Sequence, residues 1–199
     1  MRQFLFFAAV LSLLVSCGPN TKHASMDNTQ TREIKPTEIP GNPIQLFDEH
    51  WALVTAGVPG DVNTMTISWG SLGELWNKPV VTVYVSSSRY THEFMEKYDH
   101  FTVAFFPPEY RDALQYLGSH SGRDGDKITA SGRLTLEFLD SGLPSFAEAS
   151  MVIEARKIYG APFDIKGFGD VPTRTYASGR MGIHSEYVGE IEHVWVRGQ

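Results

Sequence analysis

The chain has 199 residues and a net charge of −6, and 42% of its residues are hydrophobic and 12% aromatic. This length is sufficient for one domain with a hydrophobic core, and the composition is too apolar for an intrinsically disordered chain. The acidic balance and the scattered lysines and arginines exclude a nucleic-acid-binding protein, which needs a basic surface.

The first 17 residues predict a lipoprotein signal peptide. Arg2 gives a positive start, and residues 4–15 form an apolar run that is too short to span a bilayer. The run ends in Leu14-Val-Ser-Cys17, which looks like a bacterial lipobox. We therefore expect acylation of Cys17 and a lipid anchor in a bacterial cell envelope, on the periplasmic side or at the cell surface. The alternative is a plain secretory signal with an incidental cysteine.

Residues 18–40 are polar and rich in Thr, Asn, Lys, Ser and Pro, which is typical of a flexible tether. The folded domain is therefore expected over residues 41–199. One helical turn is predicted at residues 46–50 and a first strand at residues 51–56, with a turn at residues 58–61.

The stretch Asn63-Thr-Met-Thr-Ile-Ser-Trp69 alternates apolar and polar residues with a period of two, as a half-buried strand does. One face carries Met65, Ile67 and Trp69, and the other carries Thr64, Thr66 and Ser68. Residues 70–77 are predicted as a loop whose apolar side chains either cover the core or form an interface.

A second strand is predicted over residues 80–86, followed by Ser86-Ser-Ser-Arg-Tyr-Thr91 and a short helix at residues 92–98. Thr91 is the expected N-cap of that helix. Hydroxyl groups, an arginine and a helix N-terminus at one point are typical of an anion site. The residues equally allow an ordinary solvated strand end with a helix cap.

The second half of the chain predicts short strands at residues 101–106, 134–138, 151–159 and 186–196. A helix is expected at residues 107–117, a polar loop at residues 118–126, and a long irregular stretch at residues 163–182. Many short strands with few helices predict a mainly-β closed barrel with short helical insertions.

Several ordered motifs resemble the flavin reductase-like, FMN-binding split-barrel family in its flavoredoxin-type branch. They are Asn63-Thr-Met-Thr-Ile-Ser-Trp69, Pro79-Val-Val-Thr-Val-Tyr-Val85, Ser88-Arg-Tyr-Thr91, Tyr110-Arg-Asp-Ala-Leu114, Gly118-Ser-His-Ser-Gly-Arg-Asp-Gly-Asp-Lys127 and His184-Ser-Glu-Tyr-Val-Gly-Glu-Ile191. The resemblance implies an FMN-binding split β-barrel with short helical insertions over residues 41–199. It also implies a homodimer with the flavin site at the interface between its subunits.

By this resemblance, residues 63–69 lie along the flavin ring and residues 88–91 lie at its phosphate. The ring is expected to contact Met65, Trp69 and Tyr90. The candidates for hydrogen bonds to the pyrimidine edge are Asn63, Thr64, Thr66 and Ser68. The candidates for the phosphate are Ser86, Ser88, Arg89 and Thr91.

Two further elements complete the expected site. Arg123 and Lys127 are candidates for the N1–O2 edge of the ring or the phosphate, where positive charge stabilises reduced flavin; the alternative is a solvated turn. His184 is the candidate catalytic residue, which would orient a substrate or donate a proton; the alternative is a hydrogen-bonded surface histidine.

Other kinds of site are disfavoured by the sequence. Asp124 and Asp126 suggest a calcium loop, but the later glutamate and further carboxylates that such a loop needs are missing. The histidines show no metal-ligand spacing, and Ser121 has no nucleophile-elbow sequence around it. No metal is therefore expected.

Two functions fit the resemblance. One is an oxidoreductase whose bound FMN accepts hydride from NADH or NADPH, and the other is a non-catalytic electron carrier or flavin storage protein. Export would separate the chain from cytosolic nicotinamide cofactors, and the sequence has no G-x-G-x-x-G fingerprint. We therefore expect a membrane electron-transfer protein or a quinone-linked partner as donor. A third interpretation is a structural domain that has lost its flavin.

Overall fold

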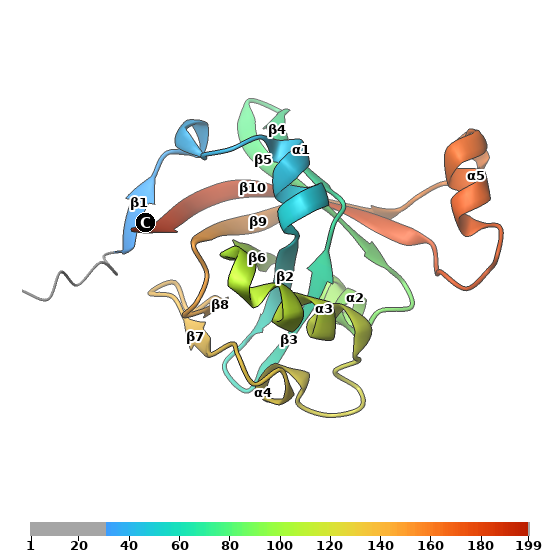
Figure 1. Ribbon diagram of the computed structural model, residues 1–199. Coiled ribbons are helices and arrows are strands. Elements are labelled where there is room, and N and C mark those ends of the chain that lie inside the picture. The colour runs from blue at the N-terminus through green and yellow to red at the C-terminus, as the bar shows by residue number, and fades with distance from the viewer. Residues whose placement is uncertain (1–30, 199) are drawn as a thin grey trace, which may run out of the picture.

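The structure is a computed structural model that describes residues 31–198 (Figure 1). The predicted signal peptide, Cys17 and the first part of the predicted tether lie outside the described residues. Within residues 31–198, no helix is long and apolar enough to cross a membrane.

Eight strands form one antiparallel sheet in the order β3-β2-β6-β9-β10-β5-β4, and β1 pairs with β10 beside this path. These strands are β1 (Thr31–Ile34), β2 (Ala52–Val58), β3 (Asp61–Ile67), β4 (Gly70–Leu75), β5 (Lys78–Ser86), β6 (His100–Phe105), β9 (Met151–Pro162) and β10 (His184–Arg197). β7 (Leu136–Phe138) and β8 (Pro144–Phe146) form a separate pair. The predicted mainly-β fold with short helical insertions is confirmed.

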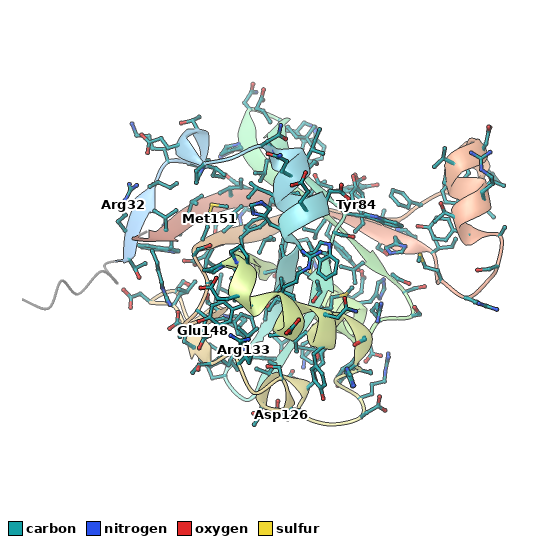
Figure 2. All side chains as sticks on the ribbon, viewed as in Figure 1. Arg32, Tyr84, Asp126, Arg133, Glu148 and Met151 are labelled. Atoms are coloured by element: carbon teal, nitrogen blue, oxygen red, sulfur yellow. The ribbon has the colours of Figure 1, made fainter. Side chains whose placement is uncertain are left out.

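Short helices lie between the strands. They are α1 (Pro43–Gln45), which continues as a π-helical turn (Leu46–His50), α2 (Tyr90–Lys97), α3 (Arg111–Ser119), α4 (Lys127–Ala130) and α5 (Asp170–Tyr176), with 3-10 turns at Pro36–Glu38, Pro108–Tyr110 and Ile165–Gly167. Figure 1 shows α5 projecting from the body of the molecule, in the connection between β9 and β10. Figure 2 shows Tyr84 on the side nearer to α5, and Asp126 and Arg133 at the other end, near α4.

The sheet separates two apolar clusters. Successive strand residues point to opposite faces, so Leu53 and Val54 of β2 belong to different clusters. Val54 packs with Val83 and Tyr187 inside the curved sheet, and Leu53 packs with residues of α3 such as Leu114. These clusters pack β3, β5 and β10 into the sheet, and the functional site lies at the ends of those strands.

The loop prediction for residues 70–77 is wrong, because Gly70–Leu75 is a strand that pairs with β5. The hairpin turns at Trp76 and Asn77, which have φ values of 54° and 59°. Two consecutive positive φ values are typical of a type I′ turn, whose twist matches that of the flanking strands. Leu72 packs on the core, whereas Trp76 is exposed.

Part of the predicted tether is ordered as a strand. Thr31–Ile34 pairs with the end of β10, and Ile34 is buried. The carboxylate of Glu33 lies 2.7 Å from Nδ1 of His193, which joins the two strands through their side chains. The segment is too short and too polar for its sequence to predict a strand. It becomes a strand because β10, at the other end of the chain, supplies its hydrogen bonds.

Two helix predictions also differ from the structure. The helix expected at residues 92–98 begins at Tyr90, with Arg89 as its N-cap, so the prediction of Thr91 as N-cap is wrong. Thr91 lies inside the first turn, where it is buried and its hydroxyl accepts a hydrogen bond from Asn63. The stretch predicted to be irregular at residues 163–182 contains α5.

Candidate functional site

The site begins at the turn between β5 and α2. The N–H of Arg89 donates to the carbonyl of Ser86 at 2.9 Å, which closes the turn. The hydroxyl oxygens of Ser86 and Ser88 lie 2.9 Å apart. The turn therefore presents two hydroxyl groups directly before the first N–H groups of α2, where the helix dipole is positive.

A second segment packs closely on this turn. The Ser86 hydroxyl donates to the carbonyl of Gly182 at 3.0 Å, and the N–H of Ser87 donates to Ile183 at 3.0 Å. A Cβ on Gly182 would lie 2.5 Å from the Ser87 hydroxyl and 3.0 Å from the backbone nitrogen of Ser88. Glycine is thus the residue that permits this approach of the two backbones.

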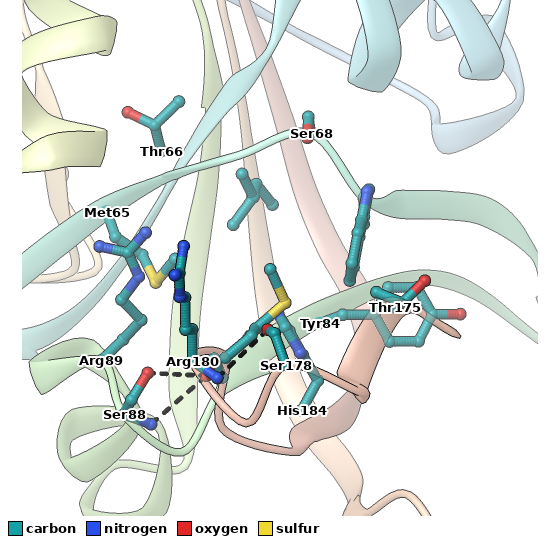
Figure 3. Close-up of a pocket in the computed structure, with 14 residues that line it drawn as sticks. Met65, Thr66, Ser68, Tyr84, Ser88, Arg89, Thr175, Ser178, Arg180 and His184 are labelled. Atoms are coloured by element: carbon teal, nitrogen blue, oxygen red, sulfur yellow. Dashed lines mark hydrogen bonds between the residues drawn. The ribbon is translucent and has the colours of Figure 1, made fainter. Parts of the chain in front are cut away.

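A cavity of about 530 Å³ opens beside the turn (Figure 3), which is within the usual range for a small-molecule site. Its lining residues come from β3 and the connection to β4, from β5 and the following turn, and from α5 and the segment before β10. They are Met65, Thr66, Ile67, Ser68, Trp69, Tyr84, Ser86, Ser88, Arg89, Thr175, Ser178, Arg180, Met181 and His184.

The charge of the cavity is positive. Arg89 and Arg180 are its charged residues, and carboxylates are absent from the described lining. Figure 3 shows the two side chains extending in the same direction, away from Ser88. Arg89 is held by a hydrogen bond of 3.0 Å from its guanidinium to the carbonyl of Gly118. Two guanidinium groups beside a helix N-terminus favour an anionic ligand.

His184 lines the cavity at the start of β10. The register of β10 against β5 places it opposite Ser86. Its ring centroid is 4.9 Å from that of Trp69, and its Nδ1 is 2.8 Å from the Tyr176 hydroxyl. Burial, followed by the charge of Arg89, lowers the pKa of His184 to about 4. The imidazole is therefore neutral near pH 7 and acts as a hydrogen-bonding group.

The structure brings together many of the residues that the sequence predicts for the site. The cavity lining includes Met65, Thr66, Ser68, Trp69, Ser86, Ser88, Arg89 and His184. The lining combines hydroxyl-bearing and cationic side chains with apolar and aromatic ones. The assignment of each side chain to a part of the flavin stays a prediction.

Other predicted residues lie outside the cavity lining and stabilise its walls. The Asn63 side chain donates to the Thr91 hydroxyl at 2.8 Å, which ties β3 to the start of α2. The Thr64 hydroxyl donates to the carbonyl of Val54 at 3.1 Å and is buried. Tyr90 packs its ring on Phe94 with their centroids 5.1 Å apart.

Arg123 and Lys127 lie outside the cavity lining. Arg123 forms an ion pair with Glu93 and lies over the Tyr90 ring, 4.8 Å from its centroid. Lys127 is buried, and its Nζ donates to the carbonyls of Leu117 at 2.9 Å and His120 at 3.0 Å. Burial, followed by the charge of Arg89, lowers the pKa of Lys127 to about 8. Their predicted contact with a flavin stays a prediction, because the observed contacts are with the protein.

The part of the site that precedes β10 was not predicted from the sequence. Tyr84, Thr175, Ser178, Arg180 and Met181 line the cavity, and all except Tyr84 come from the stretch predicted to be irregular. One signal was present in the sequence, the stretch Gly179-Arg-Met-Gly182 shortly before the last strand. Within residues 31–198, no group of three or more His, Cys, Asp or Glu residues is placed to hold a metal ion.

Comparison with known proteins identifies the family of this chain. The model of the flavin reductase like domain family matches residues 45–199. The chain belongs to this family. The family prediction made from the ordered motifs is therefore confirmed, and the curved sheet with β3 and β4 at its ends is the split barrel that was expected. No curated protein matches the sequence.

Solved structures of flavin proteins share this fold. An FMN-binding domain of a flavin reductases-like enzyme from Shewanella baltica is 17% identical, with a TM-score of 0.61 over 85% of this chain and 78% of its own. The FMN-binding protein of Thermus thermophilus is 25% identical, with a TM-score of 0.58 over 80% of each chain. Flavoredoxin of Methanosarcina acetivorans is 25% identical, with a TM-score of 0.56 over 72% of this chain and 66% of its own.

Proposed function

We propose that this chain binds FMN in the cavity beside residues 86–89 and works as a flavin-dependent oxidoreductase. The observation that carries the proposal is the cationic, carboxylate-free wall formed by Arg89 and Arg180 at the N-terminus of α2. Hydroxyl groups and guanidinium groups beside a helix N-terminus together match a phosphate monoester. The site of the phosphate is thus the turn at Ser88.

The remainder of the cavity suits the flavin ring. Met65 and Trp69 supply apolar and flat surface, and Ser68 supplies a hydroxyl group. The Thr66 hydroxyl donates to the carbonyl of Leu114 at 2.5 Å, so it is left only as an acceptor. When it is bound, FMN supplies the hydride and electron transfer. The protein's own part is to hold the phosphate, orient the ring and present the neutral His184 beside it.

The relatives support FMN as the cofactor. The Thermus protein is described as FMN-binding and the Methanosarcina protein as a flavoredoxin, and each is 25% identical to this chain. The NADH:FAD oxidoreductase of Streptomyces globisporus is 18% identical, so its likeness concerns the fold alone. NADH and NADPH remain proposed electron donors.

A second function is an electron carrier that a membrane partner reduces, and the sequence favours it through the lipobox at Cys17. An exported and lipid-anchored chain would not meet cytosolic nicotinamide cofactors. The anchor, the cell-envelope location and the homodimer belong to the proposal. Labelled fatty acid on the wild-type protein and its loss in Cys17→Ser would support the anchor, whereas equal labelling would exclude it.

The test of the function is an absorbance spectrum of the purified protein, followed by anaerobic titration with NADH and NADPH. Flavin bands that bleach with either nucleotide support a reductase. Flavin bands that persist with both nucleotides and bleach with dithionite support the electron carrier. A colourless protein that also fails to take up added FMN would exclude both functions.

A further inference from the structure

The segment between β9 and β10 is attached to the cavity by a chain of aromatic rings. Every residue of α5 is at least partly exposed, so burial in the core does not hold this helix in place. Instead, Phe168 stacks on Tyr176 with their centroids 5.4 Å apart and their planes 18° apart. Phe168 contacts Phe163, which in turn packs on Tyr84 of β5 at 5.5 Å.

The chain of rings ends at the residue that faces the cavity. The ring of Tyr176 is 5.8 Å from that of His184, and the ring of His184 is 4.9 Å from that of Trp69. The Tyr176 hydroxyl lies 2.8 Å from Nδ1 of His184. Within residues 31–198, Nε2 has no hydrogen-bond partner. Because His184 lines the cavity, Nε2 is the nitrogen that is left for a ligand.

The protonation states leave few arrangements for this pair. Burial raises the pKa of the Tyr176 hydroxyl, which therefore keeps its proton near pH 7. His184 is neutral there, so one ring nitrogen carries a hydrogen and the other accepts one. A tyrosine hydroxyl that donates to Nδ1 places the histidine hydrogen on Nε2, since the partner of one ring nitrogen selects the tautomer of the other.

We propose that Tyr176 is a positioning residue, whose hydroxyl donates to Nδ1 of His184 and so presents Nε2–H as a hydrogen-bond donor to the ligand in the cavity. The ligand-facing part of this inference rests on the proposed function, since FMN or its substrate would accept that hydrogen bond. The same segment carries Ser178 and Arg180 into the lining. The orientation of His184 therefore depends on the packing of α5, which carries Tyr176.

The tautomer can be measured directly by NMR in the full-length protein labelled with 15N-histidine, before any FMN is added. Long-range 1H–15N correlations identify which nitrogen of His184 carries the proton, and His184→Gln assigns the signals. We expect protonated Nε2 in the wild type and a mixture of both tautomers in Tyr176→Phe. A phenylalanine at position 176 can keep the stack on Phe168, so the variant should fold. Its amide spectrum and melting temperature check this.

A matched control removes the hydroxyl of a tyrosine that does not line the cavity. Tyr159 of β9 is 44% exposed and lies outside the cavity lining, so Tyr159→Phe should leave the tautomer of His184 unchanged. Protonated Nδ1 in the wild type, or an unchanged tautomer in Tyr176→Phe, would overturn the proposal. Because this measurement needs no FMN, it is informative even if the protein does not bind flavin.

The ligand-facing part has its own test. FMN titration of the wild type, Tyr176→Phe and Tyr159→Phe should show about a threefold to tenfold weaker affinity in Tyr176→Phe alone, the usual effect of one misplaced hydrogen bond. Equal affinities in all three proteins would overturn this part. Failure of all three to bind FMN would instead count against the proposed function.

Discussion

The hydroxyl of Ser86 and the carbonyl of Gly182 are joined by a hydrogen bond of 3.0 Å across 96 positions of the chain. This bond fastens the segment that carries Arg180 to the turn that carries Arg89. This bond and the one from Ser87 N–H to the carbonyl of Ile183 hold the two halves of the cationic wall together. A Cβ on Gly182 would lie 2.5 Å from the Ser87 hydroxyl at this contact.

Gly182→Ala should separate these two segments. We expect a loss of about 1–3 kcal/mol in the free energy of unfolding, typical of overpacking, together with about tenfold weaker FMN binding. Thermal unfolding and FMN titration measure the two effects. Gly73→Ala is the control, because a Cβ at Gly73 meets nothing within 4 Å. Unchanged FMN affinity in Gly182→Ala would show that the contact does not shape the site.

Arg89→Lys should weaken FMN binding about tenfold or more, because a lysine cannot reproduce the planar bidentate geometry of a guanidinium on phosphate. Riboflavin, which lacks the phosphate, should bind the variant and the wild type almost equally. Arg133→Lys serves as the control, since Arg133 lies over the Tyr110 ring and near α4 (Figure 2). Equal losses for FMN and riboflavin would place the phosphate elsewhere.

The pKa values of His184 and His193 should be shifted in opposite directions from the ordinary value of 6.5. Burial lowers the pKa of His184 to about 4, and the hydrogen bond to Glu33 raises the pKa of His193. A pH series of NMR spectra measures both midpoints in one sample. A normal midpoint for His184 would show that its ring is solvated.

The same shifts predict how stability depends on pH. Between pH 6.5 and about 4 the unfolded chain binds the His184 proton more readily than the folded chain, so this group lowers the stability as the pH falls. His193 stabilises the fold at low pH, and its contribution is lost as the pH rises through its raised pKa. Denaturation of His184→Gln and the wild type across this range separates the first effect.

Lys127 should make the protein more stable as the pH rises above 8. Its pKa is lowered to about 8, so between pH 8 and 10.5 the unfolded chain binds the proton more readily than the folded chain. The free energy of unfolding of the wild type should therefore rise relative to Lys127→Met, by at most about 1.4 kcal/mol per pH unit. Lys35→Met, at an exposed lysine, is the control. A pH-independent difference would mean that Lys127 is hydrated.

Local sequence patterns were sufficient to predict much of this protein. The alternation at residues 63–69 predicted β3, and the valine-rich residues 80–85 predicted β5. The serines and arginine after β5 predicted an anion site, because a strand end followed by a helix start places such groups together whatever the rest of the chain does. The ordered motifs predicted the family, which the comparison confirms.

Elements that depend on a distant partner were not predictable in this way. β1 is a strand because β10 supplies its hydrogen bonds, and α5 is held by the rings of Phe163 and Phe168. Lys127 was predicted from the sequence as a cationic ligand for a flavin, and that contact stays a prediction; only the folded chain shows that its Nζ donates to two backbone carbonyls.

The cavity itself arises from pairing between distant strands. The register of β10 against β5 places His184 opposite Ser86, and the connection before β10 then carries Arg180 beside Arg89. Short-range periodicity reports which residues share a face of one strand, but it holds no information about which strand lies next to it. The sequence alone therefore identified the family and predicted a phosphate site at the turn after β5, and only the tertiary structure revealed the neighbouring segment with Arg180 and the Tyr176–His184 pair.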